Sequence, residues 1–128
     1  KYGDIGYSYV EVDLSNQHVY LIVSGKLVTD SPCVTGCVKN GHGTPDGLYS
    51  VTYKESPSVL RGEDYETKVN FWMPFNRGIG LHDATWRDEF GGDIYYSGGS
   101  HGCVNPPYQK AAVIYENIYA GMPVICYY

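Results

Sequence analysis

SHGCVN, residues 100–105, puts a cysteine directly after a glycine and just before the clearest helical pattern of the chain. Asn105 precedes Pro106 and Pro107, as an N-cap residue precedes the residue type favoured at the first helical position. Gly121 stands where a glycine often ends a helix, and Pro123 cannot continue one. The sequence therefore predicts an amphipathic helix between these signals, with apolar residues at helical spacing: Ala111, Ile114, Tyr115 and Ile118.

Cys103 is the candidate nucleophile of this stretch. It lies just outside the predicted helix N-terminus, where unpaired backbone N–H groups together carry about half a positive charge. Such a position favours a thiolate over a thiol and predicts a lowered pKa for the Cys103 side chain. The backbone N–H groups of Gly102 and Cys103 could stabilise the oxyanion of a tetrahedral intermediate.

A cysteine nucleophile needs a base, and two histidines are candidates for that role. His82 follows residues 79–81, an apolar run that we interpret as a strand holding the imidazole in a fixed place. His101 is close to Cys103 along the chain, so in an extended turn its side chain would share a side with the sulfur or form a wall of the substrate pocket. We predict that His82 is the base.

The composition indicates one domain, residues 1–128, rich in strands and turns. Of its 128 residues 43% are hydrophobic, and its 14 Tyr, 16 Gly and 7 Pro favour strands and turns over helices. A net charge of −5 provides no basic surface for phosphates, which argues against a nucleic-acid partner. The chain starts at Lys1 without a signal peptide or membrane span, so we expect a domain excised from a longer protein, with an anchor or further domains upstream.

Period-two alternation and turn residues predict a mainly β fold, a sandwich or barrel with one late α-helix. Residues 55–67 are polar and are interpreted as an excursion over the surface. Residues 83–99 form a long connection with glycines on both sides of an aromatic and charged middle, which is typical of a lid or groove wall. The strands, of which the first three form an antiparallel meander, are expected at 7–13, 18–23, 27–35, 48–54, 68–74 and 122–128.

Three cysteines remain besides the nucleophile: Cys33, Cys37 and Cys126. At most one disulfide can form among them, either Cys33–Cys126 on neighbouring strands or Cys33–Cys37. The second needs a bend at Gly36, because a straight strand would separate the pair by ~13 Å against a limit of ~7 Å. Buried free thiols are the alternative. Cys33 and Cys37 with His42 make a poor zinc signature, so we expect no metal and no cofactor.

These motifs resemble those of a known family. Gly80-Leu81-His82-Asp83 followed by SHGCVN is similar to the signature of the L,D-transpeptidase (YkuD) catalytic domain, with the 21 positions between His82 and Cys103 suiting its Gram-positive type. The resemblance covers nearly the whole chain, through further matches at 35–36, 44–49, 71–75 and 121–125. It implies a β-sandwich of mixed and antiparallel strands, with the late helix packed beside it.

The resemblance also implies a function. Cys103 would attack the L-centre carbonyl of residue three in a tetrapeptide stem of peptidoglycan and release D-Ala. Transfer of the thioester to a side-chain amine of a second stem would give a 3→3 cross-link. Carbapenems would acylate the same sulfur. The activity would lie on the extracellular face of the cell envelope, in the cell wall, with contact to a membrane only through an upstream anchor.

Further roles are expected for residues in and around these motifs. The resemblance implies that the third member of the catalytic triad is the backbone carbonyl of Asp83, with the Asp83 carboxylate incidental. His101 would shape the pocket, while Ser100 and Asn105 would hold the cysteine loop by hydrogen bonds; an N-cap role for Asn105 is compatible with this. Other substrate-binding candidates, with their alternatives, are Trp72 and Met73 (groove or core), Tyr96 (groove wall) and Arg87 (binding a stem carboxylate, or pairing with Asp83 or Asp88).

Other functions use the same residues. Water as acceptor would make the domain an L,D-carboxypeptidase, and a cysteine peptidase of another fold would also need a thiol and a base. A catalytically dead wall-binding module is a third reading, which the intact Cys103, His82 and Gly102 disfavour. A zinc site using Cys103, His101 and His82 fits the His-Gly-Cys spacing poorly.

Overall fold

A mixed five-stranded sheet forms the base of the computed structural model, which describes residues 8–61, 66–100 and 102–128. Its strands are β1 (Tyr9–Asp13), β2 (His18–Val23), β3 (Lys26–Pro32), β4 (Gly47–Ser50) and β9 (Pro123–Tyr127). The order across the sheet is β3-β2-β1-β9-β4. The first three strands form the predicted antiparallel meander, while β9 pairs in parallel with β1 and antiparallel with β4.

Two hairpins and two helices complete the fold. The elements are β5 (Ser58–Arg61), β6 (Glu66–Val69), β7 (Trp72–Asn76), β8 (Ile79–His82), α1 (Ile94–Gly98) and α2 (Tyr108–Asn117). Residues 55–67, expected to cross the surface, contain β5 and enter β6, and the strand expected over 68–74 is divided between β6 and β7. The division has a cause: the N–H groups of Asn70 and Phe71 bind the Asp83 carboxylate instead of a neighbouring strand.

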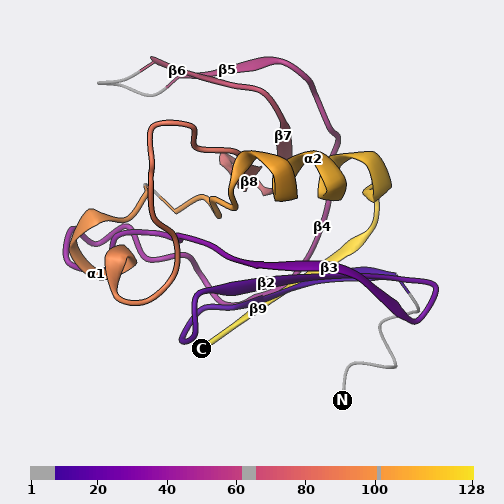
Figure 1. The fold of residues 1–128 in the computed structure, drawn as a ribbon, viewed down its shortest axis with the longest axis horizontal. Coiled ribbons are helices and arrows are strands. Elements are labelled where there is room, and N and C mark those ends of the chain that lie inside the picture. Colours follow the sequence, from indigo (N-terminus) through magenta and orange to yellow (C-terminus); the bar gives the residue numbers. More distant parts are fainter. Residues whose placement is uncertain (1–7, 62–65, 101) are drawn as a thin grey trace.

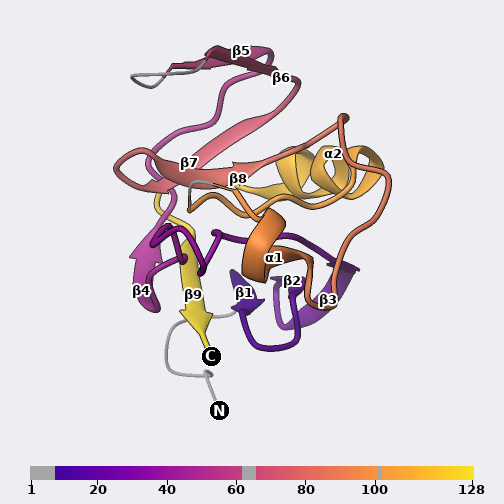
Figure 2. The same ribbon diagram turned by 90° about the vertical axis from the view of Figure 1, so that its left-hand side faces the viewer.

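The core lies between the five-stranded sheet and a second layer formed by β7, β8 and α2 (Figure 1). Every second side chain of β1 is buried, as are Val19 and Leu21 of β2, as the alternation predicted, whereas Val23 at the end of β2 is only partly buried. Met73, Leu81 and Ile114 cover them from the second layer. The β5–β6 hairpin extends beyond this layer, away from the sheet (Figure 2). The mainly β, mixed-sheet architecture predicted from the sequence is therefore confirmed, with a second, shorter helix that was not expected.

The boundaries of the late helix differ from the prediction. Helix α2 begins at Tyr108, and its N-cap is Pro107, which makes no side-chain cap. Asn105 is not a cap, because its backbone N–H and carbonyl both pair with Val34 in an isolated bridge. The helix also ends at Asn117, so Gly121 is not its C′ residue; the φ of +94° at Gly121 instead serves the turn into β9.

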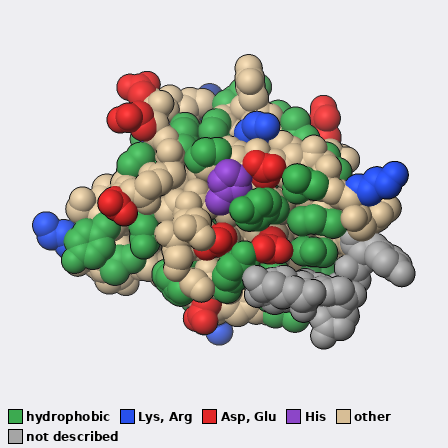
Figure 3. Space-filling view, turned by 60° about the horizontal axis from the view of Figure 1, so that its bottom comes forward, with side chains coloured by type: hydrophobic (Ala, Val, Ile, Leu, Met, Phe, Trp, Pro, Cys, Tyr) green, Lys and Arg blue, Asp and Glu red, His purple; other side chains and the backbone are tan. Residues whose placement is uncertain are grey.

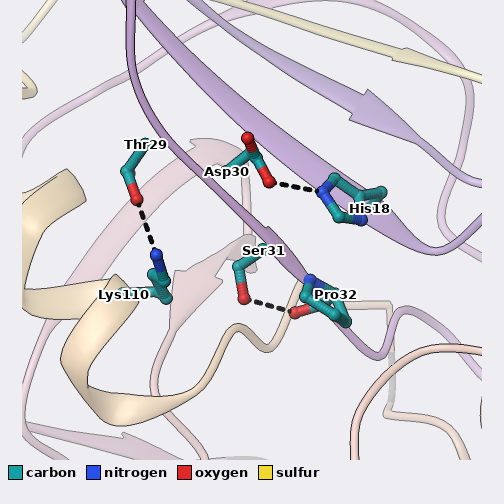
Figure 4. A network of polar contacts seen from close by, with 6 residues as sticks. All are labelled: His18, Thr29, Asp30, Ser31, Pro32 and Lys110. Atoms are coloured by element: carbon teal, nitrogen blue, oxygen red, sulfur yellow. Dashed lines mark hydrogen bonds and ion pairs between the residues drawn. The ribbon is translucent and has the colours of Figure 1, made fainter.

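The outer face of the sheet carries hydrophobic side chains mixed with carboxylates (Figure 3). His18 lies there and pairs with Asp30, with 2.9 Å between Nε2 and Oδ1 (Figure 4). On the same strand as Asp30, the hydroxyl of Thr29 accepts a hydrogen bond from Lys110 Nζ at 3.1 Å (Figure 4). This contact ties α2 to the edge strand β3.

All four cysteines are buried free thiols, which is the alternative to a disulfide considered above. The described residues contain no group of three or more side chains suited to hold a metal ion. In the part of the chain that the structure describes, no helix is both long and apolar enough to cross a membrane.

Candidate active site

The register between β8 and the cysteine loop brings distant residues to one face. Leu81 and Val104 form a parallel bridge, held by hydrogen bonds from His82 N–H to the Val104 carbonyl at 3.1 Å and from Val104 N–H to the Gly80 carbonyl at 2.9 Å. Leu81 and Val104 are both fully buried in the core. Because side chains alternate along extended backbone, His82, Cys103 and Asn105 all face the opposite way.

That face opens into a cavity of about 530 Å³. One wall comes from the β5–β6 hairpin and the other from the cysteine loop and the connection after β8. The lining residues are Leu60, Glu66, Thr67, Lys68, His82, Trp86, Arg87, Gly99, Ser100, Cys103 and Asn105. The nucleophile and the base predicted from the sequence thus line one cavity, together with Ser100, Arg87 and Asn105.

The tautomer of His82 follows from its neighbours. Its Nδ1 lies 2.7 Å from the backbone carbonyl of Asp83, which can only accept, so Nδ1 carries the proton. Its Nε2 accepts a hydrogen bond from Asn105 Nδ2 at 3.2 Å. Burial lowers the pKa of His82, against the opposing effects of the Asp83 carbonyl and carboxylate. The imidazole is therefore neutral at pH 7, and its Nε2 can take a proton.

Arg87 settles the orientation of the Asn105 amide. Arg87 Nε donates to Asn105 Oδ1 at 3.2 Å, and its Nη1 donates to the Gly98 carbonyl at 2.9 Å. Because a guanidinium has no acceptor, the amide oxygen must face Arg87 and the amide nitrogen must face His82. Among the described residues, neither Asp83 nor Asp88 forms the ion pair with Arg87 that was considered as the alternative.

The two ends of Asp83 have separate tasks. Its carbonyl accepts from His82, whereas its carboxylate, only 1% exposed, accepts three hydrogen bonds from the link between β6 and β7. These come from the Asn70 backbone at 2.8 Å, the Asn70 side chain at 2.7 Å and the Phe71 backbone at 2.9 Å. The contact to the imidazole is thus made by the main chain.

The Cys103 sulfur is held as a thiol. Burial raises its pKa to about 11, and a backbone hydrogen bond with Gly80 opposes the rise only in part. The lowered pKa predicted from a helix N-terminus is wrong, because α2 begins at Tyr108 rather than directly after the cysteine. The sulfur instead packs with Val69 and Trp72 and lies 3.6 Å from the Gly78 carbonyl. Reaction at neutral pH thus requires removal of the thiol proton.

Ser100 and Gly102 shape the loop around the sulfur. The Ser100 hydroxyl donates to the Cys103 carbonyl at 2.5 Å and accepts from the Gly102 N–H at 3.2 Å. Gly102 has a φ of +120°, which strains any other residue, and a Cβ there would lie 3.1 Å from Ile79 Cδ1. His101 lies outside the described residues.

The predicted groove residues take different positions. Trp72 is 6% exposed; its ring backs the His82 imidazole at 5.9 Å between centroids, and its Nε1 donates to the Tyr53 hydroxyl. Met73 is fully buried in the core, since neighbours on a strand face opposite sides, so its assignment to the groove is wrong. Tyr96 on α1 is 57% exposed and does not line the cavity, so its predicted contact with substrate is not supported.

Sequence reasoning missed several lining residues. Leu60, Glu66, Thr67 and Lys68 fall within or next to the segment interpreted as a surface excursion. The Val59-Leu60 pair in an otherwise polar segment was the available signal for a strand there. Trp86 lies in the connection predicted to be a groove wall, and its ring centroid is 6.1 Å from that of His82.

Comparisons with known proteins agree with one another. Residues 7–126 match the family model described as the L,D-transpeptidase catalytic domain, YkuD. The L,D-transpeptidase of Enterococcus faecium, solved as a mutant, is 36% identical with a TM-score of 0.90, over 95% of this chain and 50% of that chain. No curated protein matches the sequence.

Two further structures extend the comparison. The catalytic domain of the E. faecium enzyme, acylated by ertapenem, is 38% identical with a TM-score of 0.83, over 94% of this chain and 96% of that one. An L,D-transpeptidase from Mycobacterium smegmatis is 25% identical with a TM-score of 0.79, over 95% of this chain and 59% of that one. The chain thus spans about half the length of the first E. faecium structure and nearly all of the isolated catalytic domain.

Proposed function

The chain belongs to the YkuD family of L,D-transpeptidase catalytic domains, in its Gram-positive type, and we propose that it joins peptidoglycan stems through a thioester on Cys103. The observation that carries this proposal is the bridge between Leu81 and Val104, which turns His82 and Cys103 onto one face of a shared cavity. A thiol and a neutral imidazole that line one cavity of peptide size suit acyl transfer.

The first step moves a proton and forms one bond. His82 Nε2 takes the Cys103 proton as the sulfur attacks the L-centre carbonyl of residue three in the donor stem. The Asn105 amide gives up or shares its contact with Nε2 at this point. The imidazolium that results is stabilised by its Nδ1–H bond to the Asp83 carbonyl, which fixes the ring plane throughout.

The oxyanion of the tetrahedral intermediate forms next to the cysteine loop. Its candidate donors are the backbone N–H groups of Cys103 and Gly102, of which the second donates to Ser100 Oγ before substrate binds. Collapse of the intermediate passes the His82 proton to the leaving amine, and D-Ala departs. The side-chain amine of an acceptor stem then attacks the thioester, loses its proton to His82 and frees the sulfur. The product is a 3→3 cross-linked pair of stems.

The cavity walls fit a substrate that carries both charges. Lys68 and Arg87 are cationic, and Glu66 is anionic. A donor stem presents a terminal carboxylate, which the cations can bind, and an acceptor stem presents an amine, which a carboxylate can bind. Ser100, Asn105 and Trp72 hold Cys103 and His82 rather than the stems, and His101 belongs to the same loop in sequence.

The same sulfur is the proposed target of carbapenems. The E. faecium catalytic domain has been solved acylated by ertapenem, a member of that class. The sulfur attacks a β-lactam carbonyl as it attacks the stem carbonyl. The amine released when the ring opens is not lost, because it stays tethered to the acyl group through the rest of the former ring. Because peptidoglycan is the substrate, the domain acts at the cell envelope, on its extracellular face.

The test supplies purified tetrapeptide stems, with and without a free side-chain amine on residue three, and identifies the products by mass spectrometry. A cross-linked dimer that has lost one D-Ala supports transpeptidation. Tripeptide alone, even with the amine present, would assign the domain as an L,D-carboxypeptidase. Unchanged stems, or products that persist with Cys103→Ala, would overturn the proposal.

A further inference from the structure

Thr44 lies beneath the cysteine loop, with 1% of its surface exposed. Its hydroxyl accepts a hydrogen bond from the Gly36 N–H at 2.9 Å and donates to the Gly102 carbonyl at 2.6 Å. The direction of both bonds is settled, because an N–H can only donate and a carbonyl can only accept. The single hydroxyl proton of Thr44 is therefore committed to the residue before the nucleophile.

This contact fixes one peptide plane. The Gly102–Cys103 bond is trans, since the only cis bond among the described residues precedes Pro57. In a trans peptide the carbonyl and the next N–H point in opposite directions. Holding the Gly102 carbonyl against the buried Thr44 hydroxyl therefore turns the Cys103 N–H away from Thr44, in a loop whose Ser100 and Cys103 line the cavity.

Among the described residues of the loop, the Cys103 N–H is the backbone donor without a partner. No described residue accepts a hydrogen bond from it, whereas the Gly102 N–H is taken by Ser100 Oγ at 3.2 Å. A backbone N–H in a protein wall is strongly driven to find an acceptor. The oxygen of an acyl group bound in the cavity would be such an acceptor.

Thr44 is itself held firmly. Its carbonyl accepts from the Tyr128 hydroxyl at 3.0 Å. Gly36 packs so closely that a Cβ there would lie 1.9 Å from the His42 carbonyl oxygen and 2.6 Å from the Thr44 nitrogen. Gly36 also bridges to Ser100, which brings this support back to the cysteine loop. The hydroxyl thus has a fixed position from which to orient the peptide.

We propose that Thr44 is a positioning residue, whose hydroxyl aims the Cys103 N–H at the oxyanion of the tetrahedral intermediate. The inference rests on the proposed acyl-transfer function. Thr44 touches no reacting atom and acts through the Gly102–Cys103 peptide. Its effect should therefore appear only in reactions of Cys103 that develop charge on an oxygen.

The experiment compares two reactions of the same sulfur in wild type, Thr44→Val and Thr44→Ser. Acylation by a carbapenem passes through an oxyanion, whereas alkylation by iodoacetamide does not. Thr44→Val should lower the acylation rate about tenfold or more, as loss of an oriented donor does, and leave the alkylation rate within about twofold. Thr44→Ser keeps the hydroxyl and should restore acylation.

Acylation of Thr44→Val at the wild-type rate would overturn the inference, as would an equal fall in acylation and alkylation. A second measurement on wild type covers the case in which Thr44→Val does not fold. With ¹⁵N-cysteine labelling, the Cys103 amide proton, assigned through Cys103→Ser, should shift downfield on acylation. An unmoved signal in a fully acylated sample refutes the proposal. Failure of wild type to be acylated at all would instead refute the proposed function.

Discussion

The imidazole of His82 is oriented by the main chain of Asp83, at 2.7 Å from Nδ1 to the carbonyl oxygen, while the Asp83 carboxylate serves the fold through Asn70 and Phe71. The proposed catalytic contact and the contacts that stabilise the fold are thus made by two ends of one residue. Substitution of the side chain should separate them, because every residue type keeps the carbonyl.

Asp83→Ala should destabilise the domain by roughly 2–4 kcal/mol, because two backbone N–H groups and the Asn70 amide lose their acceptor in a buried site. At a temperature where the variant is folded, carbapenem acylation should stay within about threefold of wild type. Denaturant unfolding and acylation rates measure the two effects. A loss of rate to the level of a variant without His82 would make the carboxylate part of the catalytic group.

His82→Ala should lower the rate of Cys103 acylation by ~10² or more, as expected for loss of a positioned base. His18→Ala is the matched control, since His18 pairs with Asp30 on the outer face of the sheet. Stopped-flow absorbance of the opening β-lactam measures both. An unchanged rate in His82→Ala would give the role of base to His101.

Alkylation of Cys103 in the free enzyme should be slow at pH 6 and rise about tenfold per pH unit up to pH 9, since burial raises the thiol pKa to about 11. The same shift affects stability. The folded state favours the protonated thiol, so this contribution is full below the ordinary thiol pKa of 9.0 and is lost as pH rises through about 11. A rate already at its plateau at pH 6 would mean that the sulfur is a thiolate paired with His82.

Asn105→Asp should move the acid limb of the acylation profile to higher pH. The wild-type amide donates to His82 Nε2, which opposes protonation of that nitrogen. A carboxylate in its place favours the imidazolium, so the pKa of His82 rises and more of the base is already protonated at neutral pH. The rate measured from pH 5 to 9 should recover at high pH. A rate lowered equally at every pH would indicate damage to the loop instead.

Met73→Ala should cost about 2–5 kcal/mol of stability, because its fully buried side chain would leave a cavity in the core. The KM for the donor stem should not change, since Met73 is buried in the core and does not line the cavity. Thermal unfolding measures the loss of stability, and initial rates over a range of stem concentrations give the KM. A selective rise in KM with unaltered stability would restore Met73 to the substrate groove.

The sequence was most informative where a pattern is local. The alternation in β1 and β2 predicted the first strands, and the family signature singled out Cys103 and His82, which line one cavity in the structure. The hairpin of β5 and β6 escaped because its pairing depends on a partner rather than on hydrophobic period. Asn105 was assigned to a helix cap from its neighbours, but a bridge to Val34, distant in sequence, decides its conformation.

The pKa of Cys103 and the hydrogen bond of Thr44 also could not be predicted from the local sequence. The pKa predicted for Cys103 assumed a helix beginning beside the sulfur, whereas the packing of Trp72 and Val69 controls it. Thr44 appeared in the sequence only as part of a matched segment. Its hydrogen bond to Gly102 joins residues 58 positions apart, which no window along the chain can detect.

The position of β9 between β1 and β4 has a consequence for biosynthesis. This strand is the last of the described strands and yet fills an interior place in the largest sheet, so the β1–β2–β3 meander, complete at Pro32, must wait with an open edge until β9 begins at Pro123. Nascent chains halted before residue 123 should therefore remain protease-sensitive on the ribosome, and chaperones that shield unpaired edges should bind them.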